Sequence, residues 1–247
     1  MQDSLNLKRE TFITILSTRR SGKSYLIARL IYNFMVANDA NNRCNLLYLF
    51  SNTAKFEQSG TYSFIDPKVV FKANTENVEK IITRLLEIQL QTKKVNHILV
   101  IFDDIDLSKK YENSIELLAT RGRHYNITTI LSAQVATNCI SPCIRNNTSY
   151  LFFRKLNSET IKKQIYSMVI NNDFDSPEKF KKYVTDNIAD YQFIFYDNDT
   201  DEKAMKIIKA EPIPADYKYV IKSPPPKTIQ KGLFYGYGKP MNEFRKM

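Results

Sequence analysis

Short apolar runs of strand length alternate with longer segments of helical periodicity between residues 11 and about 154. The expected strands are residues 11–16, 46–50, 98–102, 128–132 and 150–153, and the expected helices are residues 24–36, 76–90 and 111–119. This alternation is typical of strands that pair in parallel and carry their connecting helices on the faces of the sheet. The pattern therefore predicts an α/β fold with a mostly parallel sheet.

The alternation of strands and helices ends after the last of these strands. A helix is expected over residues 158–169, and Ser176 followed by Pro177 is typical of the N-cap and first turn of another helix. Residues 191–197 and 203–210 flank the polar stretch "NDTDE", which predicts a β-hairpin. We therefore expect one domain over residues 1–211, with a core at 8–156 and an extension at 157–211. The Pro/Gly-rich residues 212–247 should form an extended or partly mobile tail.

The chain is basic, with 36 Lys plus Arg against 26 Asp plus Glu and a formal charge of +10. From Lys218 to the end there are seven basic residues and one acid. Such an excess favours a polyanionic partner, and its concentration in the tail favours nucleic acid. A basic surface that only confers solubility is the alternative.

No apolar run is long enough to cross a membrane, and the N-terminus lacks the apolar segment of a secretory signal. We therefore expect an intracellular protein without membrane insertion. The three cysteines, Cys44, Cys139 and Cys143, do not form a disulfide framework or a set with zinc-ligand spacing, so we interpret them as reduced thiols.

A strand, a short loop and a helix surround the sequence "STRRSGKS" at residues 17–24. This is nearly the phosphate-binding pattern of Gly, four residues, then Gly-Lys-Ser, with Ser17 in place of the first glycine. In such a loop the backbone N–H groups cradle phosphates, Lys23 reaches the β- and γ-phosphates, and Ser24 binds magnesium. The expected nucleotide-binding residues are Thr18, Arg19, Arg20, Ser21, Gly22, Lys23, Ser24 and Tyr25. For Arg19 and Arg20, exposure to solvent is the alternative to a contact with the triphosphate.

A phosphate loop needs an acidic partner, and "HILVIFDDID" supplies one at the end of a buried strand. Asp103 is expected to hold Mg²⁺ through water, and Asp104 to polarise the attacking water. The same two aspartates are also compatible with an ordinary turn that ends a strand. Their position eighty residues after Lys23 favours the nucleotide site, with ATP and Mg²⁺ as its ligands.

The stretch "LLATRGRHYNITTILSAQ" predicts a third part of the site. Residues 127–132 are expected to form a buried strand, so Gln134, two residues beyond it, should lie at the carboxyl edge of the sheet, where it can orient water or sense the γ-phosphate. Arg121 and Arg123 precede that strand, and either could act as an arginine finger in a neighbouring subunit. An exposed basic loop is the alternative for both arginines.

The motifs "RRSGKS", "ILVIFDD" and "RGRHYNITTILSAQ", in this order and spacing, resemble the genome-packaging ATPases of large eukaryotic DNA viruses, of the poxvirus type and including those of virophages. Those proteins belong to the FtsK/HerA branch of P-loop motors. The resemblance covers roughly residues 8–170, and Leu118-Ala119, Gly122-Arg123 and Gln134 look like the register of FtsK motors. It implies a homo-oligomeric ring, pentameric or hexameric, that pumps double-stranded DNA.

The leading hypothesis is therefore an ATPase that packages a viral genome by translocating double-stranded DNA, with capsid proteins as further partners. Its expected location is the virus factory or cytoplasm of an infected cell, or the virion. Two alternatives remain open: a P-loop kinase that phosphorylates a small molecule, and a nucleotide-gated DNA-binding or capsid-assembly protein with little hydrolysis.

Overall fold

The computed structural model describes most of residues 5–219. The described residues are 5, 7–18, 20–36, 42–52, 60–105, 112–134, 140–154, 176–186, 188–200 and 205–219, together with Glu159, Lys162, Lys163, Ile165, Tyr166 and Phe174. Across this part of the chain, no helix combines the length and the apolar character needed to cross a membrane.

One eight-stranded sheet forms the centre of the molecule, in the order β3-β2-β4-β5-β1-β6-β7-β8. The strands are β1 (Phe12–Ser17), β2 (Leu46–Ser51), β3 (Val70–Phe71), β4 (Ile98–Asp103), β5 (Ile127–Gln134), β6 (Tyr150–Arg154), β7 (Gln192–Asp197) and β8 (Met205–Lys209). The strands from β3 to β6 pair in parallel, and β7 and β8 pair antiparallel at one side. The fold is therefore α/β and mostly parallel, as the sequence predicts.

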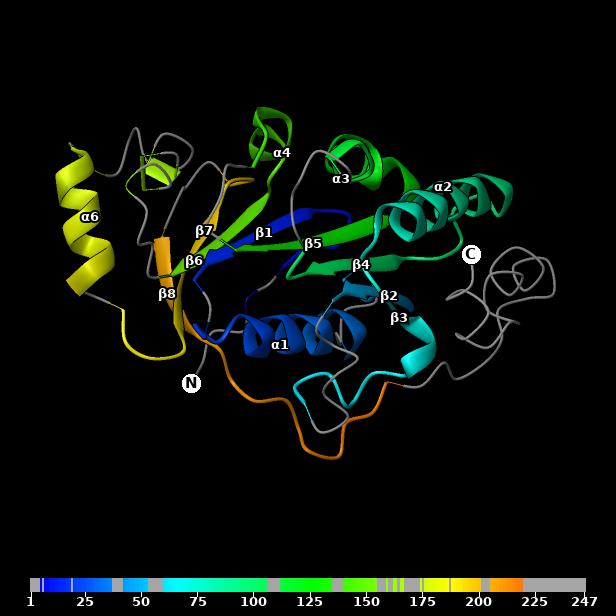
Figure 1. Ribbon diagram of the computed structural model, residues 1–247, viewed down its shortest axis with the longest axis horizontal. Coiled ribbons are helices and arrows are strands. Elements are labelled where there is room, and N and C mark those ends of the chain that lie inside the picture. Colours follow the sequence, from blue (N-terminus) through cyan, green and yellow to red (C-terminus); the bar gives the residue numbers. More distant parts are fainter. Residues whose placement is uncertain are drawn as a thin grey trace.

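Helices cover both faces of the sheet (Figure 1). Helix α1 (Lys23–Val36) lies on one face, while α2 (Thr75–Gln91), α3 (Glu112–Arg121) and α4 (Pro142–Asn146) lie on the other. Apolar side chains alternate along the strands, so β1 sends Ile13 and Ile15 into the α1 side and Phe12 and Leu16 into the opposite core. This arrangement explains why the parallel strands are apolar on both faces.

The expected elements are confirmed to within one or two residues at most ends. Ser176 accepts a hydrogen bond from the Lys179 N–H at the start of α6 (Pro177–Asp186), and β7 and β8 form the expected hairpin. The described residues of the helix expected over 158–169 are helical, and its other residues lie outside the description. The short strand β3 and the 3-10 turns η1 (Pro67–Val69) and η2 (Gly122–Tyr125) were not predicted.

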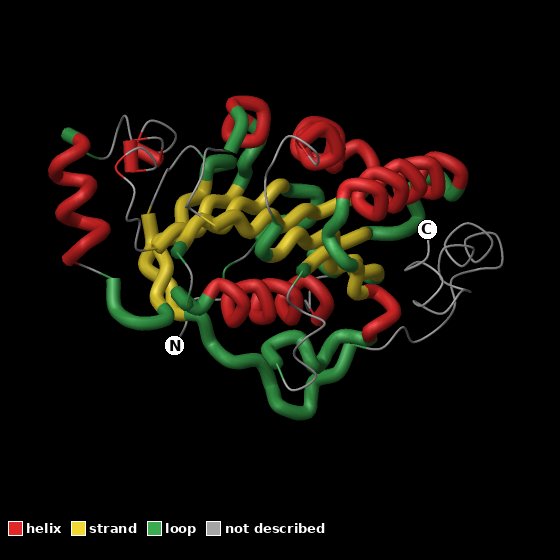
Figure 2. Tube along the Cα trace, in the orientation of Figure 1, coloured by secondary structure: helices red, strands yellow, loops and turns green. Residues whose placement is uncertain are grey.

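The segment after β8 crosses the molecule beneath α1 as an irregular strap over residues 210–219, shown as a tube in Figure 2. Tyr217 packs edge-to-face on Tyr32 of α1, with ring centroids 4.8 Å apart. The Tyr219 N–H donates to the Phe64 carbonyl, and the Asp66 N–H donates to the Tyr219 carbonyl. The strap therefore ties α1 to the segment that follows β2. The boundary predicted at residues 211 and 212 stays a prediction.

Candidate nucleotide-binding site

The loop between β1 and α1 has the backbone of an anion-binding concavity. Arg20 has φ 57° and Gly22 has φ 89°, whereas Ser21 between them has negative φ. Alternating handedness turns successive N–H groups toward the same side, which creates a concave nest of donors. Helix α1 follows directly, and its first backbone bond runs from the Leu26 N–H to the Gly22 carbonyl. The first N–H groups of an α-helix have no intrahelical acceptor, which makes the start of a helix suited to an anion.

Ser17 occupies the position where this loop usually has glycine. Its φ is negative, so the backbone here does not require glycine. The side chain is fully buried, and its hydroxyl lies 2.6 Å from the hydroxyl of Ser21 across the loop. The serine therefore links the two ends of the loop. Lys23 is 8% exposed, and its ammonium group donates to the Ser17 carbonyl over a long 3.5 Å.

Strand order brings the other motifs to the same edge of the sheet. Ser17 at the end of β1 is paired with Gln134 at the end of β5, and Asp103 at the end of β4 is paired with Ser132 of β5. Asp104 follows in a left-handed conformation, with φ 53°. Such a conformation is uncommon for a residue other than glycine and is concentrated at functional sites. The phosphate loop, the two aspartates and the backbone of Gln134 thus lie at one carboxyl edge.

Asp103 is 2% exposed and has an unusual environment for a carboxylate. Tyr62, from the segment after β2, donates its hydroxyl to Oδ2 of Asp103 at 2.8 Å, while Oδ1 is buried without a hydrogen-bond partner among the described residues. Burial raises the pKa of Asp103, while the hydrogen bond from the Tyr62 hydroxyl lowers it. The neighbouring Asp104 adds to the rise in this pKa, and the Lys23 ammonium and the nearby Ser132 hydroxyl lower it further. A buried carboxylate with one unsatisfied oxygen is suited to an added cation.

A buried arginine that the sequence analysis did not single out connects the loop to the hairpin. Arg154, the last residue of β6, pairs with Ser17 on the side opposite Gln134. Its guanidinium donates to the Ser21 carbonyl and forms an ion pair with Asp190 at 2.9 Å. The sequence did carry a signal, because a charged residue that ends the apolar strand "YLFFR" must emerge at the same edge as the phosphate loop.

Tyr191 is a second residue that sequence reasoning missed. It lies in the turn before β7, and a Cβ placed on Gly22 would come within 2.9 Å of its ring. Tyr25 on α1 meets the same ring edge-to-face, with centroids 5.7 Å apart. The signal was absent here, because nothing in "NIADYQF" indicates which loop the turn approaches.

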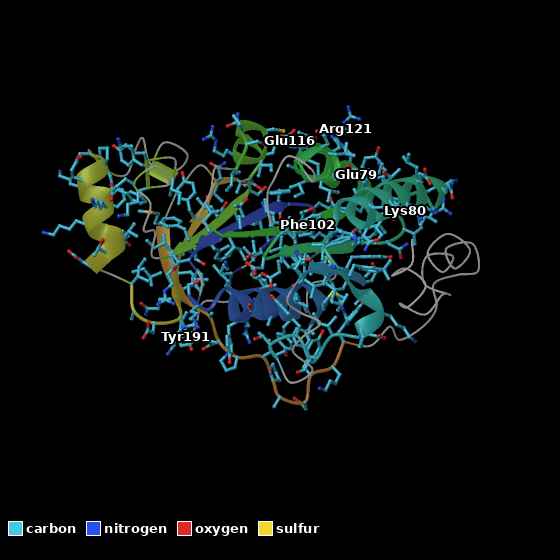
Figure 3. All side chains as sticks on the ribbon, viewed as in Figure 1. Glu79, Lys80, Phe102, Glu116, Arg121 and Tyr191 are labelled. Atoms are coloured by element: carbon cyan, nitrogen blue, oxygen red, sulfur yellow. The ribbon has the colours of Figure 1, made fainter. Side chains whose placement is uncertain are left out.

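Arg121 and Arg123 do not lie at the carboxyl edge of the sheet with the phosphate loop. Arg121 ends α3 and Arg123 lies in η2, so both precede β5 at the amino edge of the sheet. Both side chains are exposed, and in Figure 3 Arg121 points outward on the side of the molecule opposite Tyr191. The eight residues of β5 separate the two edges by about 26 Å, at about 3.3 Å per residue. Neither arginine can therefore reach the phosphate loop of its own chain.

The remaining predicted residues occupy varied positions around the loop. Thr18 and Ser24 are half-buried, and Arg20 is exposed. Tyr25 is 47% exposed on the first turn of α1. Arg19 and the side chain of Gln134 lie outside the description. The site therefore lies at one edge of the sheet, and the exposed rings of Tyr25 and Tyr191 lie beside it.

The solved structures that are similar to this chain include the following three. The DNA-packaging ATPase B204 from Sulfolobus turreted icosahedral virus is 20% identical, with a TM-score of 0.57 over 84% of this chain and 100% of that one. The genome packaging NTPase B204 from Sulfolobus turreted icosahedral virus 2, in complex with ATP-gammaS, is 18% identical, with a TM-score of 0.54 over 82% and 98%. EssC (ATPases 2 and 3) from Geobacillus thermodenitrificans is 17% identical, with a TM-score of 0.58 over 94% of this chain and 45% of that one.

No protein-family model and no curated protein matches the sequence. The structural likeness shows the fold alone: a mostly parallel sheet flanked by helices, which this chain shares with the B204 proteins and EssC.

Proposed function

We propose that this protein is an ATPase that packages a viral genome by translocating double-stranded DNA into a capsid. The observation that carries the proposal is the separation of the two halves of the site. The phosphate loop and Asp103 lie at one edge of the sheet, and Arg121 and Arg123 lie at the other. An arginine finger at that distance acts only on the nucleotide of another copy, which favours a homo-oligomeric ring over a self-contained kinase.

The chemistry at the carboxyl edge follows from the positions of four side chains. Lys23 stabilises charge on the β- and γ-phosphates, and Asp104 polarises the attacking water. Asp103 and Ser24 are suited to hold Mg²⁺, since Asp103 offers a buried oxygen without a hydrogen-bond partner among the described residues. When bound, Mg²⁺ supplies charge neutralisation to the phosphates. Tyr62 acts through Asp103 as a positioning residue, because its hydroxyl fixes one carboxylate oxygen.

Gln134 is the residue that we assign to the γ-phosphate or its attacking water. Its strand position beside Ser17 supports this role. Arg123 of a neighbouring subunit then supplies the charge that the transition state adds, and Arg121 is the second choice. In this proposal each active site is complete only at the boundary between two subunits.

The basic character of the chain supports DNA as the second substrate. The net charge of +10 favours contacts with phosphates, which are independent of base sequence and therefore suited to a motor. The similar fold of two viral packaging proteins supports a viral role. In this proposal the ring is a pentamer or hexamer that docks on capsid proteins inside an infected cell or in the virion.

The experiment that tests the proposal is ATP hydrolysis by the full chain with and without double-stranded DNA. We expect DNA to stimulate hydrolysis and Lys23→Ala to abolish it. Phosphorylation of a small molecule without DNA stimulation would instead identify a kinase. Nucleotide binding without turnover would identify a nucleotide-gated binding or assembly protein, and either result would overturn the proposal.

A further inference from the structure

Two tyrosines form an exposed aromatic pair beside the phosphate loop. Tyr25 is 47% exposed and Tyr191 is 48% exposed, and their rings meet at 77°. Most large aromatic side chains of the described part of the chain are buried in the two cores. A pair of half-exposed rings at the rim of an anion-binding loop therefore stands out as a surface for a ligand with an aromatic part.

The turn that carries Tyr191 is fixed against the loop. Ala210 at the end of the hairpin donates its N–H to the Tyr191 carbonyl at 2.8 Å. Asp190 pairs with Arg154, which also donates to the Ser21 carbonyl of the phosphate loop. Tyr191 itself has φ 60°, a conformation that is uncommon for a bulky residue and persists only where the surroundings impose it. The ring is thus presented at a defined place above Gly22.

Strand order fixes the direction in which a nucleotide would extend from the loop. Asp103 and Gln134 lie on β4 and β5, on one side of β1. The roles that the proposed function gives these two residues require the γ-phosphate to point to that side. The nucleoside must leave toward the other side of β1, where β6 and β7 follow. Tyr191 immediately precedes β7, and Figure 3 shows it at this end of the molecule, close to α1.

We infer that Tyr191 and Tyr25 form the platform on which the base of a purine nucleoside triphosphate stacks. The inference rests on the nucleotide site of the proposed function and adds how that site recognises the nucleoside. The π-face of a tyrosine stacks on any base, and the larger purine ring covers more of it. The platform therefore selects for a purine base without distinguishing adenine from guanine.

The test compares a nucleotide with a ligand that has phosphates but no base. Calorimetric titration of the full chain with a non-hydrolysable ATP analogue and with inorganic tripolyphosphate, both with Mg²⁺, measures the two affinities. We expect Tyr191→Ala to weaken binding of the analogue about 5- to 150-fold and to leave tripolyphosphate within about twofold. Tyr191→Phe keeps the ring, so it should bind both ligands about as the wild type does.

A second variant reports on the ring directly. The chain has no tryptophan, so Tyr191→Trp introduces a single indole whose fluorescence can be followed. We expect the ATP analogue and the matching GTP analogue to quench it and tripolyphosphate to leave it unchanged. If Tyr191→Ala lowers the melting temperature strongly, Tyr25→Ala on the exposed side of α1 takes its place in the titration, with a smaller expected loss.

The outcomes separate this inference from the proposed function. An equal loss of both affinities in Tyr191→Ala would mean that the ring only supports the loop at Gly22, and an unchanged affinity for the analogue would mean that the base lies elsewhere. Either result overturns the inference about the platform and does not affect the proposed translocase function. ATP hydrolysis that is not stimulated by DNA overturns the proposed translocase function and does not affect the inference about the tyrosine platform. If the wild type binds neither ligand, both are wrong.

Discussion

Replacing Tyr62 with phenylalanine removes one hydroxyl group from the carboxylate that we assign to magnesium. That hydroxyl donates to Oδ2 of Asp103 at 2.8 Å, and both residues are buried. A hydrogen bond to a charged group contributes about 1.5–3 kcal/mol, and the phenylalanine ring retains the packing. Because the hydroxyl favours the ionised carboxylate, its loss raises the pKa of Asp103 further and disorders the carboxylate.

The assay is ATP hydrolysis as a function of Mg²⁺ concentration at several pH values. Loss of an interaction that orients a metal-binding group typically weakens metal affinity or activity about 10- to 100-fold, so Tyr62→Phe should need that much more Mg²⁺ near neutral pH. The deficit should shrink as the pH rises, since Asp103 then ionises without help. Thermal melting of the variant shows whether the fold is retained.

Tyr150→Phe is the matched control. Its buried hydroxyl accepts a hydrogen bond from the Lys8 N–H at 3.3 Å, at the amino edge of the sheet and far from Asp103. This variant should lose some stability and keep the wild-type dependence on Mg²⁺ and pH. If Tyr62→Phe also keeps that dependence, or if both variants shift alike, the reasoning about Tyr62 is refuted.

Three further predictions concern the loop, the buried acid and the subunit boundary. Gly22→Ala should destabilise the fold by about 1–3 kcal/mol and abolish nucleotide binding, because Gly22 has φ 89° and the new Cβ would collide with the Tyr191 ring. Gly122→Ala is the control: its Cβ makes only ordinary contacts, so calorimetric titration with the ATP analogue should still show binding. The raised pKa of Asp103 means that, between the ordinary carboxyl value of 3.8 and the higher pKa of the folded state, the folded state keeps a proton that the unfolded state has released. Wild-type stability therefore falls as pH rises through this range and does not change further above it. Asp103→Asn should therefore melt higher than wild type, by a margin that grows as pH rises from 3.8 to the folded-state pKa and is constant above it, while hydrolysis is lost; an equal or lower melting temperature above that range contradicts this. Mixing the inactive variants Arg123→Ala and Lys23→Ala should restore part of the hydrolysis, because some subunit boundaries then combine an intact phosphate loop with an intact Arg123. If hydrolysis does not recover, Arg123 lies outside the active site.

Much of the sheet was predictable, because each parallel strand is a continuous apolar run bounded by polar residues. Strand β4 is expected at residues 98–102 and observed as Ile98–Asp103. Strand β3 was missed because its two residues carry no periodicity and depend on pairing with β2. Similarly, Pro-rich residues 212–219 predict extended chain, and the packing of Tyr217 on α1 arises only from tertiary contacts.

The sequence predicted those residues of the candidate site that belong to a recognisable motif and lie at or just after the end of a predicted strand. Asp103 ends one strand and Lys23 follows another, and parallel pairing brings the ends of those strands to one edge. Tyr62 was not predictable, because it lies in an irregular segment whose approach to Asp103 depends on the whole fold. The same holds for Tyr191, which reaches Gly22 from a turn far along the chain.

Movement along DNA is the central claim, and displacement of a third strand measures it most directly. A fluorescent oligonucleotide is bound as a triplex on linear double-stranded DNA, and its release is followed after the full chain and ATP are added. We expect release that requires ATP hydrolysis and is absent with Lys23→Ala. A wild-type protein that binds this DNA and hydrolyses ATP but leaves the third strand in place would contradict translocation.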